Sequence, residues 1–336
     1  MSRSRNLLRV LPGIAVSGFF LWLTFRKVSL HTLMAVKFVN RGWFAVMAVF
    51  LVCGYVLRIH RWWSMLRSSS RPRFSQCARV LLTSFAANNI LPFRIGDLMR
   101  VFTYADDLGT SSSIILSTVI LERLLDIFTL FLFFAATMWR GSHLPYPHVR
   151  LTAVLMLGAA GTALLVLILG ANTLEEPVKR LMAKLPQSPK VVKLEHWLLL
   201  ALEAIRKIGL VRMVVLLGES VLVWTCEGMI FVSAAKLLGL RAEMVASWQA
   251  LALCNLSFLI PSSPGSIGPF EYAANVVMTG FGENPTVATL YGTLVHLVVL
   301  ISVTGAGGIF FLVHRYHMST RKPLLEEIGT LPQEIR

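Results

Sequence analysis

The sequence predicts an all-α protein, a polytopic membrane helix bundle in which two re-entrant hairpins form an inverted repeat. Its 336 residues are 55% hydrophobic and only 15% charged, and the mean hydropathy is +0.68, which is typical of multi-pass membrane proteins. Its apolar residues fall into six runs that approach or reach crossing length. Pro and Gly beside charged residues interrupt two further segments, and lipid tolerates such breaks only where protein or water satisfies the freed backbone groups.

The six predicted spans are residues 8–25, 43–57 with flanking residues, 113–139, 151–171, 211–238 and 286–313. The first follows Arg3, Arg5 and Arg9, as a secretory signal does, but no small-x-small cleavage pattern comes after it. We therefore expect a retained first span.

The two broken segments are residues 80–104 and 247–280, and each contains Pro, an Ile-Gly step and then an acid. Each is followed at nearly the same separation by a basic or titratable side chain, Arg123 or His296, inside a long apolar run. Corresponding breaks in two halves are typical of transporters built from inverted repeats. We expect repeat one at 43–139 and repeat two at 211–313. Each broken segment is expected to be a re-entrant hairpin, with a pair of full crossings as the alternative. The predicted hinge residues are Pro92, Gly96, Pro261, Pro264, Gly265 and Gly268.

The distribution of Lys and Arg predicts the orientation. The loops after the second and fourth spans and the tail 314–336 are basic, whereas residues 141–148 are nearly neutral. Both termini are therefore expected in the cytoplasm of a bacterial or archaeal-type cytoplasmic (inner) membrane, although Arg26, Lys27, Lys37 and Arg41 oppose this. Residues 172–209 are expected to form a cytoplasmic linker and then an amphipathic helix, which lies on the membrane or packs on the protein itself.

Several function classes are disfavoured. The formal net charge of +15 comes from Lys and Arg between the apolar runs, which favours loop anchoring over nucleic-acid binding. Cys53, Cys77, Cys226 and Cys254 have no CxxC spacing and are expected to be free thiols. No enzyme motif or metal-ligand spacing occurs in the sequence, so neither a cofactor nor a metal is expected.

Three charged residues lie near the middle of the third span. Each of Glu122, Arg123 and Asp126 would cost about 2.5 to 3.5 kcal/mol facing lipid, and their helical spacing lets them approach one side of the helix. We expect them to face protein or a cavity, as part of a functional site or as a structural ion cluster.

The first break supplies the residues expected to bind an anionic head group. Arg94 and Arg100 offer paired hydrogen bonds to phosphate, beside Asp97. Asn88 and Asn89 either contact the ligand or satisfy the broken backbone. Arg58 and Arg61 are expected to anchor the loop, with the inner mouth of the same path as the alternative.

The second half supplies Glu271 and His296. Together with Glu219 and Glu227 they could form a proton relay or neutralise arginines, and for His296 a helix-packing role is the alternative. The full predicted substrate-binding set is Asn88, Asn89, Arg94, Asp97, Arg100, Glu122, Arg123, Asp126, Glu271 and His296.

Three ordered motifs resemble one family. The run from Asn89 through Pro92, Arg94, Gly96 and Asp97 to Arg100, the later Glu122-Arg123-x-x-Asp126, and the run from Pro261 to Glu271 are similar to the lysylphosphatidylglycerol synthase transmembrane-region family. That family includes the flippase half of MprF and stand-alone flippase-like proteins. The resemblance implies a lipid translocator, and among lipid partners an anionic phospholipid, a hopanoid or a polyprenyl-linked lipid. Nothing after Val313 resembles the soluble aminoacyltransferase domain, so lysyl-lipid synthesis is not expected.

The function expected from all of this is translocation of an anionic lipid or lipid-linked molecule between leaflets. One alternative is a membrane enzyme that acts on a polyprenyl phosphate or a phospholipid. The other is a non-transporting partner of a lipid-synthesis complex, in which a lipid-synthesis enzyme would be the protein partner.

Overall fold

The computed structural model describes residues 2–67, 69–139, 151, 154–162, 174–186, 188–242 and 244–329. Across this part of the chain the regular structure is entirely helical, which confirms the all-α class. The α-helices are α1 (Ser2–Phe25), α2 (Leu30–Ala35), α3 (Trp43–Leu66), α4 (Phe74–Ile90), α5 (Ile95–Phe102), α6 (Ser112–Trp139), α8 (Glu175–Ala183), α9 (Pro189–Ile208), α10 (Leu210–Leu238), α11 (Met244–Leu256), α12 (Pro269–Gly280) and α13 (Pro285–Gly329). Short 3-10 turns cover Pro92–Arg94, Asp106–Leu108, Ser257–Leu259 and Pro264–Ser266.

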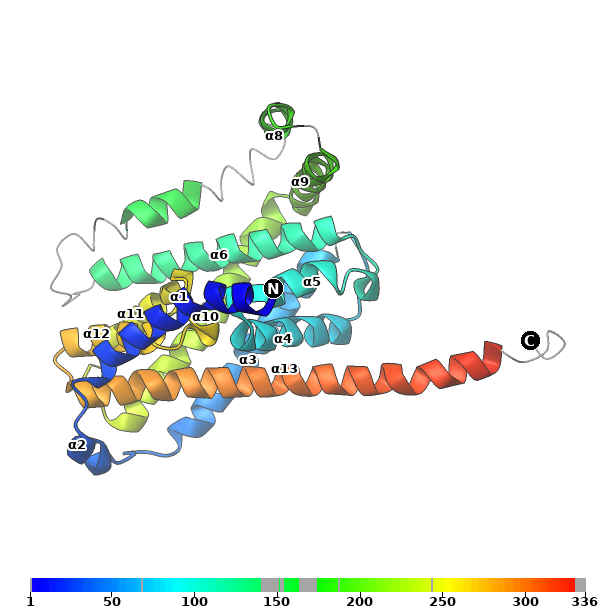
Figure 1. Ribbon diagram of the computed structural model, residues 1–336. Helices are drawn as coiled ribbons and strands as arrows, with labels where there is room; N and C mark the ends of the chain where they lie inside the picture. The colour runs from blue at the N-terminus through cyan, green and yellow to red at the C-terminus, as the bar shows by residue number, and fades with distance from the viewer. Residues whose placement is uncertain are drawn as a thin grey trace.

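Three helices are long and apolar enough to cross a membrane by length and composition, namely Trp43–Leu66, Val211–Leu238 and Pro285–Val313. The 28-residue α6 matches them in length but carries Glu122, Arg123 and Asp126. The predicted first span lies within α1. Most of the predicted span 151–171 lies outside the described residues. The chain is thus a membrane helix bundle (Figure 1).

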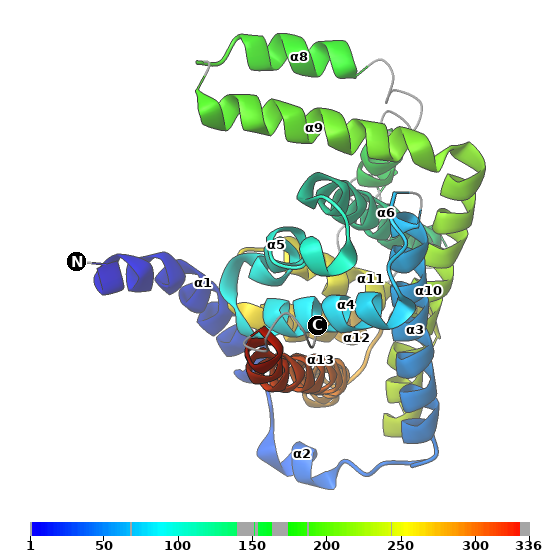
Figure 2. The same ribbon diagram turned by 90° about the vertical axis from the view of Figure 1, so that its right-hand side faces the viewer.

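The same order of elements occurs twice. One unit is α3, α4, a break, α5 and α6, and the other is α10, α11, a break, α12 and α13. Helices α3 and α10 lie side by side and antiparallel (Figure 2). Next to the start of α3, the Val39 N–H donates to the carbonyl of Leu237 at 2.9 Å. Near the other end of α3, Arg212 at the start of α10 donates to the carbonyl of Ser64.

A helix of each unit packs on the long helix of the other unit. Helix α4 packs on α13, the long helix of the other unit, and α11 packs on α6 in the corresponding way. The approach of α4 to α13 is close, because a Cβ added at Gly307 would lie only 2.2 Å from the Leu82 carbonyl oxygen. This packing brings the two breaks together, with the turn Pro264–Ser266 contacting α4 and the turn Pro92–Arg94.

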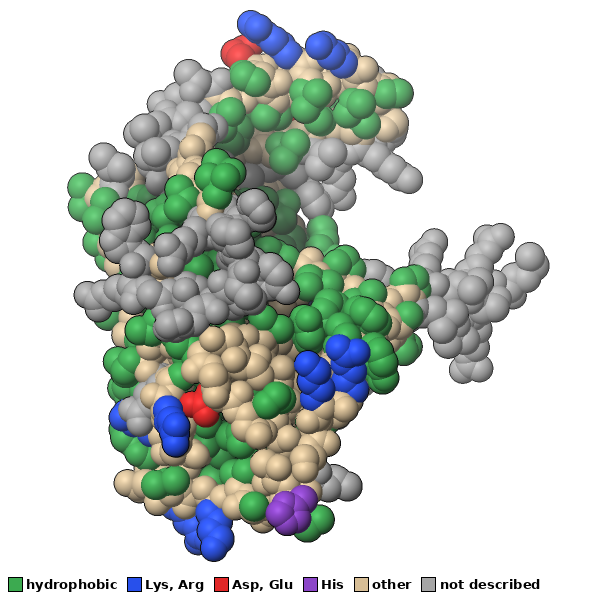
Figure 3. Space-filling model, turned by 90° about the vertical axis from the view of Figure 1, so that its left-hand side faces the viewer, with side chains coloured by type: hydrophobic (Ala, Val, Ile, Leu, Met, Phe, Trp, Pro, Cys, Tyr) green, Lys and Arg blue, Asp and Glu red, His purple; other side chains and the backbone are tan. Residues whose placement is uncertain are grey.

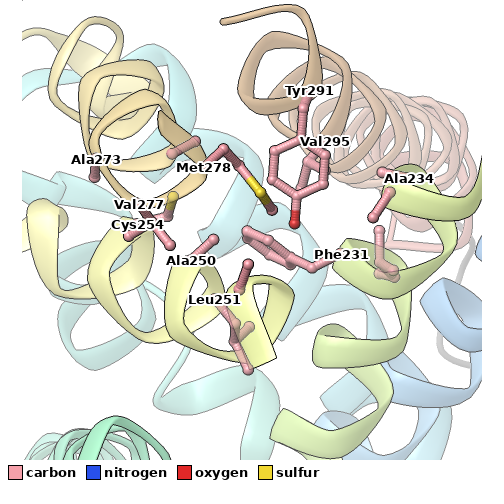
Figure 4. Packing of buried hydrophobic residues seen from close by; sticks show 14 of the residues in the cluster. Phe231, Ala234, Ala250, Leu251, Cys254, Ala273, Val277, Met278, Tyr291 and Val295 are labelled. Carbon is pink, nitrogen blue, oxygen red and sulfur yellow. The ribbon is translucent and has the colours of Figure 1, made fainter. Parts of the chain in front are cut away.

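Two apolar clusters lie mainly in one unit each, and Met47 of α3 and Leu130 of α6 also belong to the cluster of the second unit. In the first unit, side chains such as Trp62 of α3, Leu81 of α4 and Ile115 of α6 are fully buried. In the second, Phe231 of α10, Leu251 of α11, Met278 of α12 and Tyr291 of α13 converge (Figure 4). These cores fix the half-helices that carry the breaks.

Two segments are more helical than predicted. The stretch 172–193, expected as a linker, contains α8, because Pro177 falls in the first turn, where its missing N–H costs no hydrogen bond. Helix α9 begins at Pro189 behind the cap Ser188, whose hydroxyl accepts from the Val191 N–H. It packs on α6. Helix α13 continues past Val313 to Gly329, into the predicted tail.

The basic residues that opposed the predicted orientation lie together at one end of the bundle. Arg26, Lys27, Lys37 and Arg41 are exposed, and their segment is bonded there through Ser29 to Thr286 at the start of α13. Figure 3 shows basic side chains at this end, near α2. The side of the membrane on which this end lies stays a prediction.

Candidate functional site

A cavity of about 540 Å³ lies where the two breaks meet. Both breaks line it, together with α1, α3, α6, α10 and α13. Its polar lining includes Arg58, Asn88, Asn89, Arg94, Arg123, Asp126, Glu227, Asn255, Ser266 and His296, and its aromatic lining Tyr55, Phe85, Trp224, Phe231, Phe258 and Phe270. A pocket walled by aromatic rings with a few convergent polar groups is typical of ligand sites.

The two breaks share an unusual backbone feature. Arg94 (φ 52°) and Ser266 (φ 55°) are the non-glycine residues with positive φ in the described chain, one in each break. The left-handed conformation costs a residue with a Cβ about 1–2 kcal/mol. Each of the two directly precedes an Ile-Gly step, and both line the cavity. The equivalence of Arg94 and Ser266 is therefore one of backbone as well as sequence.

The glycine two positions after each of these residues allows its backbone to lie close to a neighbouring helix. A Cβ at Gly96 would lie 1.9 Å from the Ser84 carbonyl oxygen, and one at Gly268 would lie 2.6 Å from that of Ser17 in α1. Gly268 also has φ 101°. A side chain at either position would push the break away from its neighbour.

The asparagines of the first break hold its structure. Asn88 accepts from the Asp97 N–H at 3.2 Å and donates to the Asp97 carboxylate at 3.1 Å. Asn89 donates to the Thr304 hydroxyl on α13 at 3.0 Å. Both also line the cavity, so neither of their two predicted roles is excluded by position.

The charged residues of α6 face protein. The Arg123 guanidinium lies 3.1 Å from Asp97, 3.5 Å from Glu122 and 3.6 Å from Asp126. Glu122 is buried and faces Arg100 at 3.1 Å. Arg123 and Asp126 line the cavity, whereas Glu122 lies behind it.

Asp126 connects the two units. It lies 2.8 Å from Arg61 of α3 and accepts from the indole N–H of Trp224 on α10 at 3.1 Å. Arg58 of α3 pairs in turn with Glu227 of α10 and lies over the Trp224 ring. The expectation that Arg58 and Arg61 anchor a loop was wrong, because they are only 8% and 1% exposed and pair with acids that no local spacing reveals.

The two arginines predicted to bind a head group are in different environments. Arg94 is exposed at the cavity, with its guanidinium carbon 5.8 Å from the centre of the Phe258 ring in the second break. Among the described residues no carboxylate lies within ion-pair distance of it. Arg100 is 0% exposed, bonded to Glu122 and stacked over Trp62, and it does not line the cavity.

In the second break Glu271 organises the turn. One carboxylate oxygen accepts the Gly268 N–H at 2.7 Å, and the other lies 2.6 Å from Nδ1 of His296. The His296 ring stacks on Phe270 with 4.2 Å between centroids. Glu271 and His296 are both buried, and His296 lines the cavity.

Some cavity residues were missed by sequence reasoning. Ser266 could have been found, because Ser266-Ile267-Gly268 repeats the pattern of Arg94-Ile95-Gly96. Its hydroxyl is buried, with no hydrogen-bond partner among the described residues. The aromatic residues Tyr55, Trp224 and Phe258 gave no signal, because apolar runs are rich in such side chains.

The comparisons with known proteins support the resemblance carried by the motifs. The family model described as the lysylphosphatidylglycerol synthase TM region matches residues 10–307. No curated protein and no solved structure matches the chain. Because the matched residues include both units and both breaks, the chain belongs to the lysylphosphatidylglycerol synthase transmembrane-region family and is a multi-pass membrane protein of that lipid-related family.

Proposed function

We propose that this protein moves a lipid with an anionic head group between the leaflets of the cytoplasmic membrane. The observation that supports this most directly is Arg94, a cation at the cavity without a carboxylate partner in the described chain. The other arginines around the cavity, Arg58 and Arg123, each pair with an acid. An anionic ligand would supply the charge that Arg94 lacks.

The arrangement of the breaks supports movement of the ligand between leaflets. We propose that the two broken segments are re-entrant hairpins of an inverted repeat. Both line one cavity, and each packs on the long helix of the other unit. Opposed repeats around a shared site are the usual basis of alternating access. Within this proposal, Arg94 contacts the head group, and Asp97, Arg100, Glu122 and Arg123 hold the first break in place.

The test is leaflet transfer of labelled lipids in proteoliposomes. Arg94→Ala should slow transfer by roughly ten- to a hundredfold, since a hydrogen bond to a charged group contributes about 1.5–3 kcal/mol. Arg94→Lys should restore transfer only in part, because an ammonium keeps the charge and loses the planar fork. Arg41→Ala, which removes an exposed arginine that does not line the cavity, is the matched control. Transfer by Arg94→Ala at the wild-type rate would remove this residue from the site.

The same samples separate transport from chemistry. Candidate phospholipids and polyprenyl-phosphate lipids are analysed for chemical species as well as for leaflet distribution. An unchanged distribution together with a new covalent product would contradict transport and favour the membrane-enzyme alternative.

A further inference from the structure

Each unit contains a corresponding pair of an acidic and a basic side chain, and the basic member is an arginine in one unit and a histidine in the other. In both units the acid that follows the Ile-Gly step faces a basic side chain on the long helix. Asp97 of α5 lies 3.1 Å from Arg123 of α6, and Glu271 of α12 lies 2.6 Å from His296 of α13. Asp97 and Arg123 are 26 positions apart in the sequence, and Glu271 and His296 are 25 apart. An arginine keeps its charge at any physiological pH, whereas a histidine gains and loses it.

The contacts of Glu271 determine which nitrogen of His296 carries the hydrogen. A carboxyl group is a stronger acid than an imidazolium, so the hydrogen between the pair belongs to Nδ1. The second oxygen of Glu271 accepts the Gly268 N–H, as a carboxylate oxygen can. Nε2 of His296 is therefore a bare acceptor in the neutral ring and an N–H donor in the protonated ring.

Nε2 of His296 is also buried. The side chain is 5% exposed, and no hydrogen-bond partner for this nitrogen lies in the described chain. Phe270 covers one face of the ring, and Phe258 stands edge-on at 6.4 Å between centroids. His296 also lines the cavity between the breaks. Nε2 is thus a ring nitrogen without a partner in the described chain, on a residue that lines the cavity.

The charged and titratable groups around His296 come from several elements. Glu271 of α12 is in direct contact with Nδ1. The guanidinium carbon of Arg94 lies 5.8 Å from the centre of the Phe258 ring. The same cavity is lined by the charged residues Arg58, Arg94, Arg123, Asp126 and Glu227. Buried Cys254 of α11 and Tyr291 of α13 lie in the surrounding core, and the polar side chains that α4 contributes to the cavity are the neutral amides of Asn88 and Asn89.

We propose that Nε2 of His296 is a proton-binding site and that its protonation is coupled to lipid movement. The lone pair of Nε2 accepts a proton from hydronium, which becomes water, and Glu271 remains a carboxylate. The same N–H bond breaks when water on the other side accepts the proton and becomes hydronium. Protonation adds one positive charge to the cavity that an anionic ligand can balance. Arg123, the counterpart of His296, cannot make this change. The proton site stands on the geometry alone, and the coupling rests on the proposed function.

The proton site is tested without transport. Histidine ring nitrogens are followed by NMR in the labelled, purified protein, and His296 is assigned as the signal lost in His296→Gln. The pH is varied from about 8 to about 5, the range in which histidine side chains generally change charge. Nε2 should change from acceptor to N–H in this titration, while Nδ1 keeps its hydrogen throughout. An Nε2 signal that stays constant over this range would overturn the site.

Coupling is tested in liposomes that hold a gradient of one pH unit. With one proton moved per lipid, the steady-state ratio of labelled anionic lipid between leaflets should shift by up to about tenfold. His296→Gln and His296→Arg should show no shift, and Arg94→Lys should reach the wild-type ratio more slowly. The ratio is compared rather than the rate, so a slow variant remains informative.

The outcomes separate the two proposals. A wild-type ratio that ignores the gradient, or a full response in both His296 variants, overturns coupling while leaving lipid transfer intact. If the wild-type protein moves no lipid at all, the proposed function and the coupling fail together, and the NMR titration alone decides the proton site.

Discussion

At the scale of single residues, the charges inside this protein are arranged so that nearly every one has a partner. Arg100 and Arg61, the most deeply buried, are 0% and 1% exposed and face Glu122 and Asp126. Leaving one member of such a pair alone in a buried site costs far more than the pair contributes. The exposed guanidinium of Arg94 therefore stands out against its neighbours.

Replacement of Asp126 should lower the stability of the fold. Asp126→Ala removes the partner of Arg61 and the acceptor of the Trp224 N–H, and should destabilise the fold by about 3–5 kcal/mol. Asp126→Asn should cost less, because the amide oxygen still accepts hydrogen bonds. Thermal unfolding in detergent checks this, with Asp106→Ala on the exposed surface as control. Equal melting temperatures for the two alanine variants would contradict it.

The backbone of Arg94 allows a second test at this scale. Because its φ is 52°, Arg94→Gly should be more stable than Arg94→Ala by about 1 kcal/mol, since glycine adopts the left-handed conformation without steric cost. At Arg41, which lacks positive φ, the glycine variant should have no such advantage. Paired unfolding measurements decide this, and an Arg94→Gly variant less stable than Arg94→Ala would rule out strain at the break.

At the scale of elements, the sequence predicted the breaks well and the contacts around them poorly. The breaks were found because Pro92, Pro264 and the Ile-Gly steps interrupt helices for local reasons. Helix α8 was missed because Pro177 within it, and Pro186 and Pro189 after it, resemble the prolines of a linker. The pairing of Arg58 with Glu227 joins positions 169 residues apart, and the sequence offers no spacing rule for contacts of that range.

The contact between α4 and α13 depends on one glycine. A Cβ at Gly307 would lie 2.2 Å from the Leu82 carbonyl, whereas one at Gly308 would meet nothing within 4 Å. Gly307→Ala should therefore destabilise the protein by about 1–3 kcal/mol through overpacking. Gly308→Ala should be neutral or stabilising by up to about 1 kcal/mol, since alanine favours the helix. Unfolding of the two variants is compared side by side, and a stable Gly307→Ala would show that α4 can move off α13.

At the scale of the whole molecule, the two units are related by arrangement more than by sequence. Helices α3 and α10 run antiparallel, and the packing of α4 on α13 is repeated by α11 on α6. The sequence motif that the units share is short. It consists of a residue with positive φ, an Ile-Gly step and then an acidic residue. A helical period and a charge bias predict each helix separately, but the crossing of the units depends on packing between distant surfaces.

This arrangement makes a prediction about sidedness. If the units are inverted, the turn before α6 and the turn before α13 should open on opposite sides of the membrane. Ser111 and Asn284 are exposed residues in these two turns. Cys53 and Cys226 are first replaced by alanine, because Cys53 is exposed and Cys226 is half-buried. A single cysteine is then introduced at Ser111 in one variant and at Asn284 in the other. An impermeant maleimide applied to intact cells should label Asn284→Cys, and Ser111→Cys should react only after permeabilisation, as the basic loops predict. Labelling of both from one side would exclude an inverted repeat. The reverse pattern would keep the repeat and overturn only the predicted orientation.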